Sequence, residues 1–208
     1  MGNYHGVCTV YPRSEKLSKY LTDRQVKIIQ QTWAIIRQDV KRTGIIIFTK
    51  FFDQEAEMKK YFPKMVTMND RNELSTDMDR DRLETHALTV MEGLGAAVES
   101  LDDTEFLNNV LFAIGQSHVK RKIKPYMLQK LWPSMDYGFR EVLKEKYTKE
   151  TMEAWKKVYW YIKARMSEGI RDAERKKREG AKAAGAAAHD DEDDADSTFD
   201  NPYVREEN

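Results

Sequence analysis

The sequence predicts an all-α protein. Apolar residues recur at intervals of three and four through residues 22–170, and N-capping residues or helix-opening prolines precede several of these stripes. No stretch alternates apolar and polar side chains as a half-buried strand does. Because an interval of three or four keeps side chains on one face of a helix, each stripe can pack into a shared core.

The first two predicted helices lie between residues 22 and 52. Thr22, with Gln25 three residues later, forms a capping-box sequence. The stripe that follows consists of Val26, Ile29, Trp33, Ile36 and Val40. The next segment, GIIIFTKFF at 44–52, has a β-branched run that suits a strand. Its helical flanks and the lack of a partner strand favour a buried helix.

Four further helices are predicted after Pro63 and a connecting loop, VTMNDRNELS, at 66–75. Their starts are marked by capping residues or proline at Asp102, Pro125 and Thr148. Their stripes begin with Leu83, Ala87, Val90 and Leu94; Leu107, Val110, Leu111 and Ile114; Leu128, Leu131, Met135 and Phe139; and Met152, Trp155, Tyr159 and Ile162. The helices therefore follow one another to about residue 170.

The 208 residues divide into an N-terminal extension (1–21), one helical domain (22–170) and a charged tail (171–208). The tail runs from basic through alanine-rich to acidic sequence. With few apolar residues to offset its ordering entropy, we expect it to be disordered, apart from a turn or two that extends the last helix. Alternatively, the charged tail is functional and the protein is a helical adaptor.

Composition limits the function. No apolar run approaches the roughly 20 residues that span a bilayer, and no secretory signal is recognisable. A single cysteine, Cys8, excludes an internal disulfide and suits a reducing compartment. The 35 acidic and 35 basic residues cancel, so the overall charge does not favour nucleic acid. We therefore expect a cytoplasmic protein without a nucleic-acid partner.

Two of the four histidines, His86 and His118, interrupt the apolar stripes of consecutive helices. Each could simply hydrogen-bond a backbone carbonyl within the core. Alternatively, the pair faces a shared pocket and binds a metal. Two ligands cannot complete a tetrahedral zinc site, and the nearby helices contain no cysteine. Haem iron needs only one or two axial ligands, so the pair favours haem.

Residues 22–170 resemble a globin, and within that family the neuroglobin-like and globin X-like hexacoordinate members. The resemblance is carried by Trp33, GIIIFTKFF, Phe62 in KKYFP, His86 in LETHALTVM and His118 in AIGQSHVKRKIKPY. The 32-residue interval between the two histidines is also typical of the family. The resemblance implies the globin fold, with about eight helices around a haem pocket.

The resemblance implies a role for each site residue. His118 would be the proximal and His86 the distal ligand of the iron in haem b. Phe62 would stack on the porphyrin. The expected pocket lining is Phe48, Val90, Ile114, Ile123 and Leu128, for which an ordinary core position explains the sequence equally well. Ser117 or the Ile114 carbonyl would accept the proton of the non-ligating His118 nitrogen. Lys120, Arg121 and Lys122 would meet the haem propionates or form a solvated basic turn.

The function implied is reversible binding of O₂, CO or NO at bis-histidyl iron, in a sensing, redox or oxygen-supply role. An incoming gas must displace His86, which lowers the observed affinity. One alternative is a haem oxidoreductase that reduces nitrite or dioxygenates NO with the help of a reductase. A haem-free helical adaptor is a third interpretation. The sequence contains no dedicated catalytic motif, so it leaves enzyme activity open.

The N-terminus, MGNYHGVC, places Gly2 where N-myristoylation requires it and Cys8 where palmitoylation could follow. Two acyl chains would anchor the protein to a membrane surface, here the inner face of the plasma membrane. Gly6 stands where the motif prefers serine or threonine, so an ordinary terminus remains the alternative.

Overall fold

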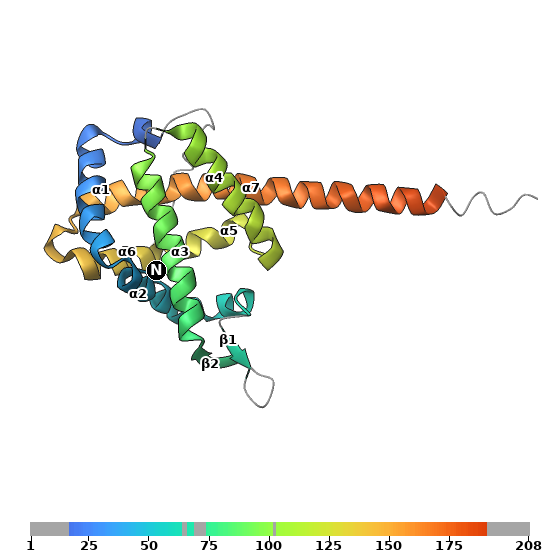
Figure 1. Ribbon diagram of the computed structural model, residues 1–208, viewed down its shortest axis with the longest axis horizontal. Coiled ribbons are helices and arrows are strands. Elements are labelled where there is room, and N and C mark those ends of the chain that lie inside the picture. The colour runs from blue at the N-terminus through green and yellow to red at the C-terminus, as the bar shows by residue number, and fades with distance from the viewer. Residues whose placement is uncertain (1–16, 64–65, 69–73, 102, 191–208) are drawn as a thin grey trace, which may run out of the picture.

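The computed structural model describes residues 17–63, 66–68, 74–101 and 103–190, and its body is built of helices (Figure 1). The α-helices are α1 (Asp23–Ile36), α2 (Val40–Gln54), α3 (Arg80–Glu99), α4 (Thr104–His118), α5 (Pro125–Leu128), α6 (Trp132–Leu143) and α7 (Lys149–Asp190). The 3₁₀ turns are η1 (Leu17–Tyr20), η2 (Arg37–Asp39), η3 (Ala56–Tyr61), η4 (Val119–Arg121), η5 (Gln129–Leu131) and η6 (Lys144–Lys146). The predicted all-α class is confirmed.

Helices α1, α2, α3 and α4 begin at side-chain caps. At α1 the predicted capping box is present, because the Thr22 hydroxyl accepts from the Gln25 amide and the Gln25 side chain accepts from the Thr22 amide, both at 3.2 Å. Asp79 caps α3 and Asp103 caps α4. The cap of α4 was expected one residue earlier, at Asp102, which lies outside the described residues.

The core is centred on α7, which runs across the body and packs against α1, α4 and α5 (Figure 1). The Trp155 ring of α7 lies 6.2 Å from that of Trp33 and 4.9 Å from that of Phe139. Its buried indole N–H donates to the Thr32 hydroxyl at 3.0 Å, so the polar atom is satisfied inside the core. The segment GIIIFTKFF lies within α2, as predicted.

Two glycines bring α4 and α7 into backbone contact. A Cβ atom on Gly115 would lie 2.1 Å from the Met166 carbonyl oxygen, and one on Gly169 would lie 2.0 Å from the Phe112 carbonyl oxygen. Only a residue without a side chain allows this approach. Because His118 is three residues beyond Gly115, the crossing fixes where that histidine lies.

The domain begins earlier than predicted. Leu17 is fully buried and Leu21 is 7% exposed, and the Tyr20 ring lies 6.3 Å from that of Tyr161 on α7. The predicted boundary at residue 22 was therefore too late. A single 3₁₀ turn is too short to show a helical period, so the sequence offered no periodic signal there.

The predicted connecting loop contains a short hairpin. Strand β1 (Val66–Met68) pairs antiparallel with β2 (Leu74–Met78), with Val66 opposite Met78 and Met68 opposite Leu74. The prediction of a plain loop was wrong at these residues. Strands of three and five residues are too short for a clear alternation of apolar and polar side chains.

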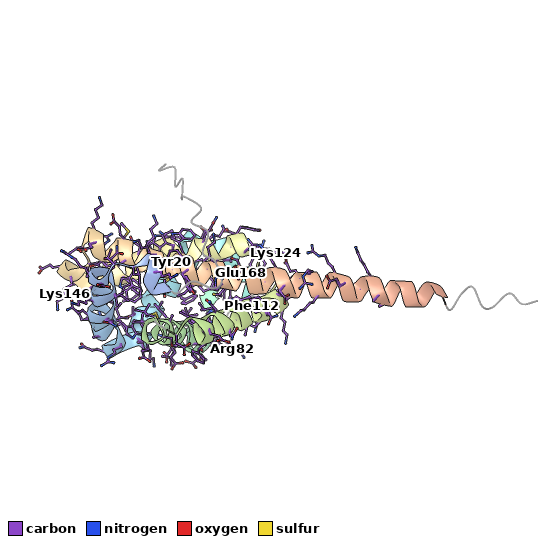
Figure 2. All side chains as sticks on the ribbon, turned by 90° about the horizontal axis from the view of Figure 1, so that it is seen from above. Tyr20, Arg82, Phe112, Lys124, Lys146 and Glu168 are labelled. Atoms are coloured by element: carbon purple, nitrogen blue, oxygen red, sulfur yellow. The ribbon has the colours of Figure 1, made fainter. Side chains whose placement is uncertain are left out.

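The last helix also extends further than predicted. Residues 171–190 continue α7 instead of forming a disordered tail, and its end extends past the body in both views (Figures 1 and 2). Alanine, lysine, arginine and glutamate are strong helix formers, and Asp172–Lys176 at 2.9 Å and Arg175–Glu179 at 3.2 Å add pairs at i,i+4 spacing. Residues 191–208 lie outside the described part. None of the described helices is long and apolar enough to cross a membrane.

Candidate functional site

His86 lies between two phenylalanines. It occupies the second turn of α3, where it is half-buried. Its ring centroid lies 5.0 Å from that of Phe48 on α2 and 5.4 Å from that of Phe62, which follows η3. Both contacts are edge-on, a favourable geometry for aromatic pairs. Three segments that are distant in sequence thus fix the position of one imidazole.

Burial, assisted by the charges of His118 and Arg121, lowers the pKa of His86 from 6.5 to about 4. The imidazole is therefore neutral at physiological pH. A neutral imidazole has one ring nitrogen with a free lone pair, which is the form that binds a metal.

His118 is the last residue of α4, and its Nδ1 lies 2.7 Å from the Ile114 carbonyl oxygen. A carbonyl can only accept, so Nδ1 carries the hydrogen, and in the neutral ring Nε2 keeps its lone pair. The Ser117 hydroxyl donates to the same carbonyl at 2.7 Å. Of the two predicted acceptors, the Ile114 carbonyl is therefore the one that His118 contacts.

A cavity of about 460 Å³ with a basic lining lies between the segments that follow His118 and precede Phe62. Its walls come from the η3 region and from η4 with the following residue: Lys60, Tyr61, Pro63, Lys120, Arg121 and Lys122. The predicted cations after His118 therefore line a cavity. None of the four basic residues forms an ion pair with another described residue. The site has an excess of positive charge that an anion can offset.

Lys60 and Tyr61 line the cavity but were not predicted from the sequence. Both belong to the KKYFP segment, from which only Phe62 was selected, and their position beside the predicted cations depends on tertiary structure. Among the predicted lining residues, Phe48 and Ile123 are buried, and Val90, Ile114 and Leu128 are half-buried. Apart from Phe48, which contacts His86, their roles around a cofactor stay predictions. Gly2 and Cys8 lie outside the described residues.

The side chains fit haem better than a metal ion held by protein ligands alone. No group of three or more His, Cys, Asp or Glu side chains within the described part of the chain could hold a metal. Two imidazoles, aromatic side chains and a cationic cavity suit a macrocycle that supplies four nitrogens and two carboxylates.

A comparison with known protein families assigns the chain to one of them. The family model for globins matches residues 46–166, which is more than half of the chain and includes Phe62, His86 and His118. This chain belongs to the globin family. Membership supports haem binding.

The relatives of this globin include cytoglobins and a neuroglobin. It is 30% identical to cytoglobin-2 of Oryzias latipes over 168 residues, covering 78% of this chain and 90% of that protein. It is 24% identical to the neuroglobin of Tetraodon nigroviridis, covering 72% and 92% of the two chains. These relatives support the neuroglobin-like assignment.

A solved structure shares the fold of this globin. It is a hexacoordinated haem protein from an anhydrobiotic tardigrade, and it aligns with a TM-score of 0.63 and 20% identity. The alignment covers 73% of this chain and 96% of that one. At this identity the likeness establishes the fold alone.

Proposed function

We propose that this globin holds one haem b between His118 and His86 and reversibly binds O₂, CO or NO at the His86 side. The observation that carries the proposal is the 2.7 Å contact between His118 Nδ1 and the Ile114 carbonyl, because it leaves Nε2 available as an axial ligand. When bound, haem supplies an iron centre for diatomic gases and one-electron chemistry.

His118 acts as the fixed ligand. The Ile114 carbonyl accepts its Nδ1 proton, which fixes the tautomer and the ring orientation and makes Nε2 a stronger donor. Because Gly115 places α4 in backbone contact with α7, the ligand stands on a helix that cannot easily shift.

His86 acts as the displaceable ligand. Its low pKa keeps it neutral and able to bind, and Phe48 and Phe62 restrict its ring. A gas must compete with this side chain, so the observed affinity is the intrinsic one reduced by the fraction of open sites. Retaining the same two protein ligands in both oxidation states favours a sensing or redox role over bulk oxygen supply.

The cations of the cavity would bind the haem carboxylates. Lys60, Lys120, Arg121 and Lys122 present charged donors, and charge-assisted hydrogen bonds to carboxylates are stronger than neutral ones. Four cations exceed the charge of two propionates, so the mouth of the pocket stays positive.

This surplus charge favours a second candidate function, nitrite reduction. A positive mouth attracts a small anion. One-electron reduction of nitrite takes up two protons and yields NO and water, and the electron must come from an external reductase or reductant. Steady NO release from nitrite by the reduced protein, faster than by free haem, supports this activity. A rate equal to that of free haem rejects it.

The absorption spectrum of the purified protein, first oxidised and then reduced, tests the proposed function. We expect sharp low-spin bands for the native chain. His86→Leu should give a high-spin spectrum, and His118→Ala should lose haem during gel filtration. His189→Ala is the matched control and should have the native spectrum. If no haem bands appear after reconstitution, the proposal is wrong and the helical adaptor becomes the better interpretation.

A further inference from the structure

The end of α7 has no partner in the described structure. Figure 1 shows it leaving the body, and Figure 2 shows Lys124 close to where it does so. There Lys124 pairs with Glu174 at 2.6 Å. Beyond this ion pair, every side chain from Arg175 to Ala184 is exposed. A helix that is exposed on all sides gains little from packing and is marginal by itself.

The charges along this end change sign in the middle. The basic segment, residues 175–182, carries five cations and one acid, and the acidic segment, residues 190–196, carries six acids. Between them lies an alanine- and glycine-rich stretch, residues 183–188. Lys177, Arg178 and Lys182 form no ion pair with any described residue. The basic segment therefore has unpaired charge, and the same chain contains the complementary charge.

The acidic segment cannot reach far along the basic segment of its own chain. Arg175 and Asp190 are fifteen residues apart in one helix, which is about 22 Å at 1.5 Å per residue. The six residues after Asp190 span at most about 20 Å when fully extended, and part of that length is needed to reverse direction. The acidic segment of a second copy is free of this limit and can cover the whole basic segment.

We propose that two copies associate through the ends of α7 in antiparallel orientation, with the basic segment of each against the acidic segment of the other. A two-fold axis beside Gly185 sets the basic segment of each copy beside the acidic segment of the other. The small residues 183–188 then meet at the centre, where they allow the chains to approach closely. A parallel arrangement would instead set like charges opposite each other.

Sedimentation velocity of the full chain at low and high ionic strength tests the proposal. We expect a dimer at low ionic strength that dissociates at high ionic strength, because exposed charges are screened by salt. The triple variant Lys177→Glu, Arg178→Glu, Lys182→Glu should be a monomer under both conditions. The control variant Lys27→Glu, Arg37→Glu, Lys146→Glu reverses three exposed cations of the body that form no ion pair with described residues, and it should remain a dimer.

Mixing two variants tests whether the contact forms between copies. The second variant, Glu192→Lys, Asp193→Lys, Asp194→Lys, should also be a monomer alone. A one-to-one mixture with the basic-segment variant should restore a dimer. A native chain that stays monomeric at low ionic strength overturns the proposal, as does a control variant that dissociates like the basic-segment variant. Far-ultraviolet circular dichroism of each variant checks that the body stays folded.

Discussion

At the level of single residues, the burial of His86 makes the stability of the haem-free protein depend on pH. The unfolded chain takes up a proton at this histidine near pH 6.5, but the folded chain takes it up only near pH 4. Between these values the unfolded state binds more protons, so the free energy of unfolding falls as the pH decreases. The total loss should be roughly 3 kcal/mol, and it is complete below about pH 4.

Urea unfolding of the haem-free protein at about pH 7 and about pH 4 measures this dependence. In the His86→Leu variant the contribution is absent, so its free energy of unfolding should change less between the two pH values. Equal pH dependence in the two proteins would show that the folded protein does not hold His86 in its neutral form.

The candidate site was predicted from sequence where helical spacing sufficed. Spacing placed His86 and His118 on apolar faces, and the structure puts His86 against Phe48 and Phe62. Spacing could not choose between Ser117 and the Ile114 carbonyl, because both lie within reach of His118. Only the side-chain geometry of the last turn of α4 selects the carbonyl.

At the level of secondary-structure elements, the close crossing of α4 and α7 predicts that a side chain at Gly115 destabilises the protein. Gly115→Ala would place a Cβ atom 2.1 Å from the Met166 carbonyl oxygen, so the helices must separate. Overpacking of this kind costs about 1–3 kcal/mol, and more where backbone must move. Because His118 is on the same helix, the variant should also release haem faster than the native chain.

Gly93 in α3 provides the control for Gly115→Ala. Gly93 has no atom within 4 Å of its would-be Cβ, so Gly93→Ala should stabilise the protein by about 0.5–1 kcal/mol. Urea unfolding and haem transfer to an acceptor protein compare both variants with the native chain. Equal stability of the two alanine variants would contradict the close contact of α4 and α7.

The elements that sequence analysis missed have a common physical reason. Apolar periodicity in a sequence reports burial, so it does not reveal elements that lack a clear apolar period. The hairpin of β1 and β2 is too short to show a period, and the end of α7 is a helix without a buried face. In that segment helix propensity and i,i+4 ion pairs favour the helix, although it has little apolar surface to bury.

In the whole molecule, the folded body begins before residue 22 and ends after residue 170, the two boundaries predicted from the sequence. At the N-terminal side Leu17 and Leu21 are core residues, although they precede the predicted boundary. At the C-terminal side Asp172 still accepts from Gln116 at 2.9 Å and Glu174 pairs with Lys124 at 2.6 Å. The packed body therefore extends from Leu17 to about Glu174.

Truncations at the two ends should therefore have opposite outcomes. A chain that starts at residue 22 loses the burial of two leucines, each worth roughly 1.5–3 kcal/mol, so its unfolding temperature should fall by many degrees. A chain that ends at residue 184 keeps every body contact of α7, so its unfolding temperature at high ionic strength should match that of the full chain. Thermal unfolding by circular dichroism compares the two. If removing residues 185–208 lowers the unfolding temperature as much as removing residues 1–21, the end of α7 contributes to the stability of the body, and the folding unit extends beyond Glu174.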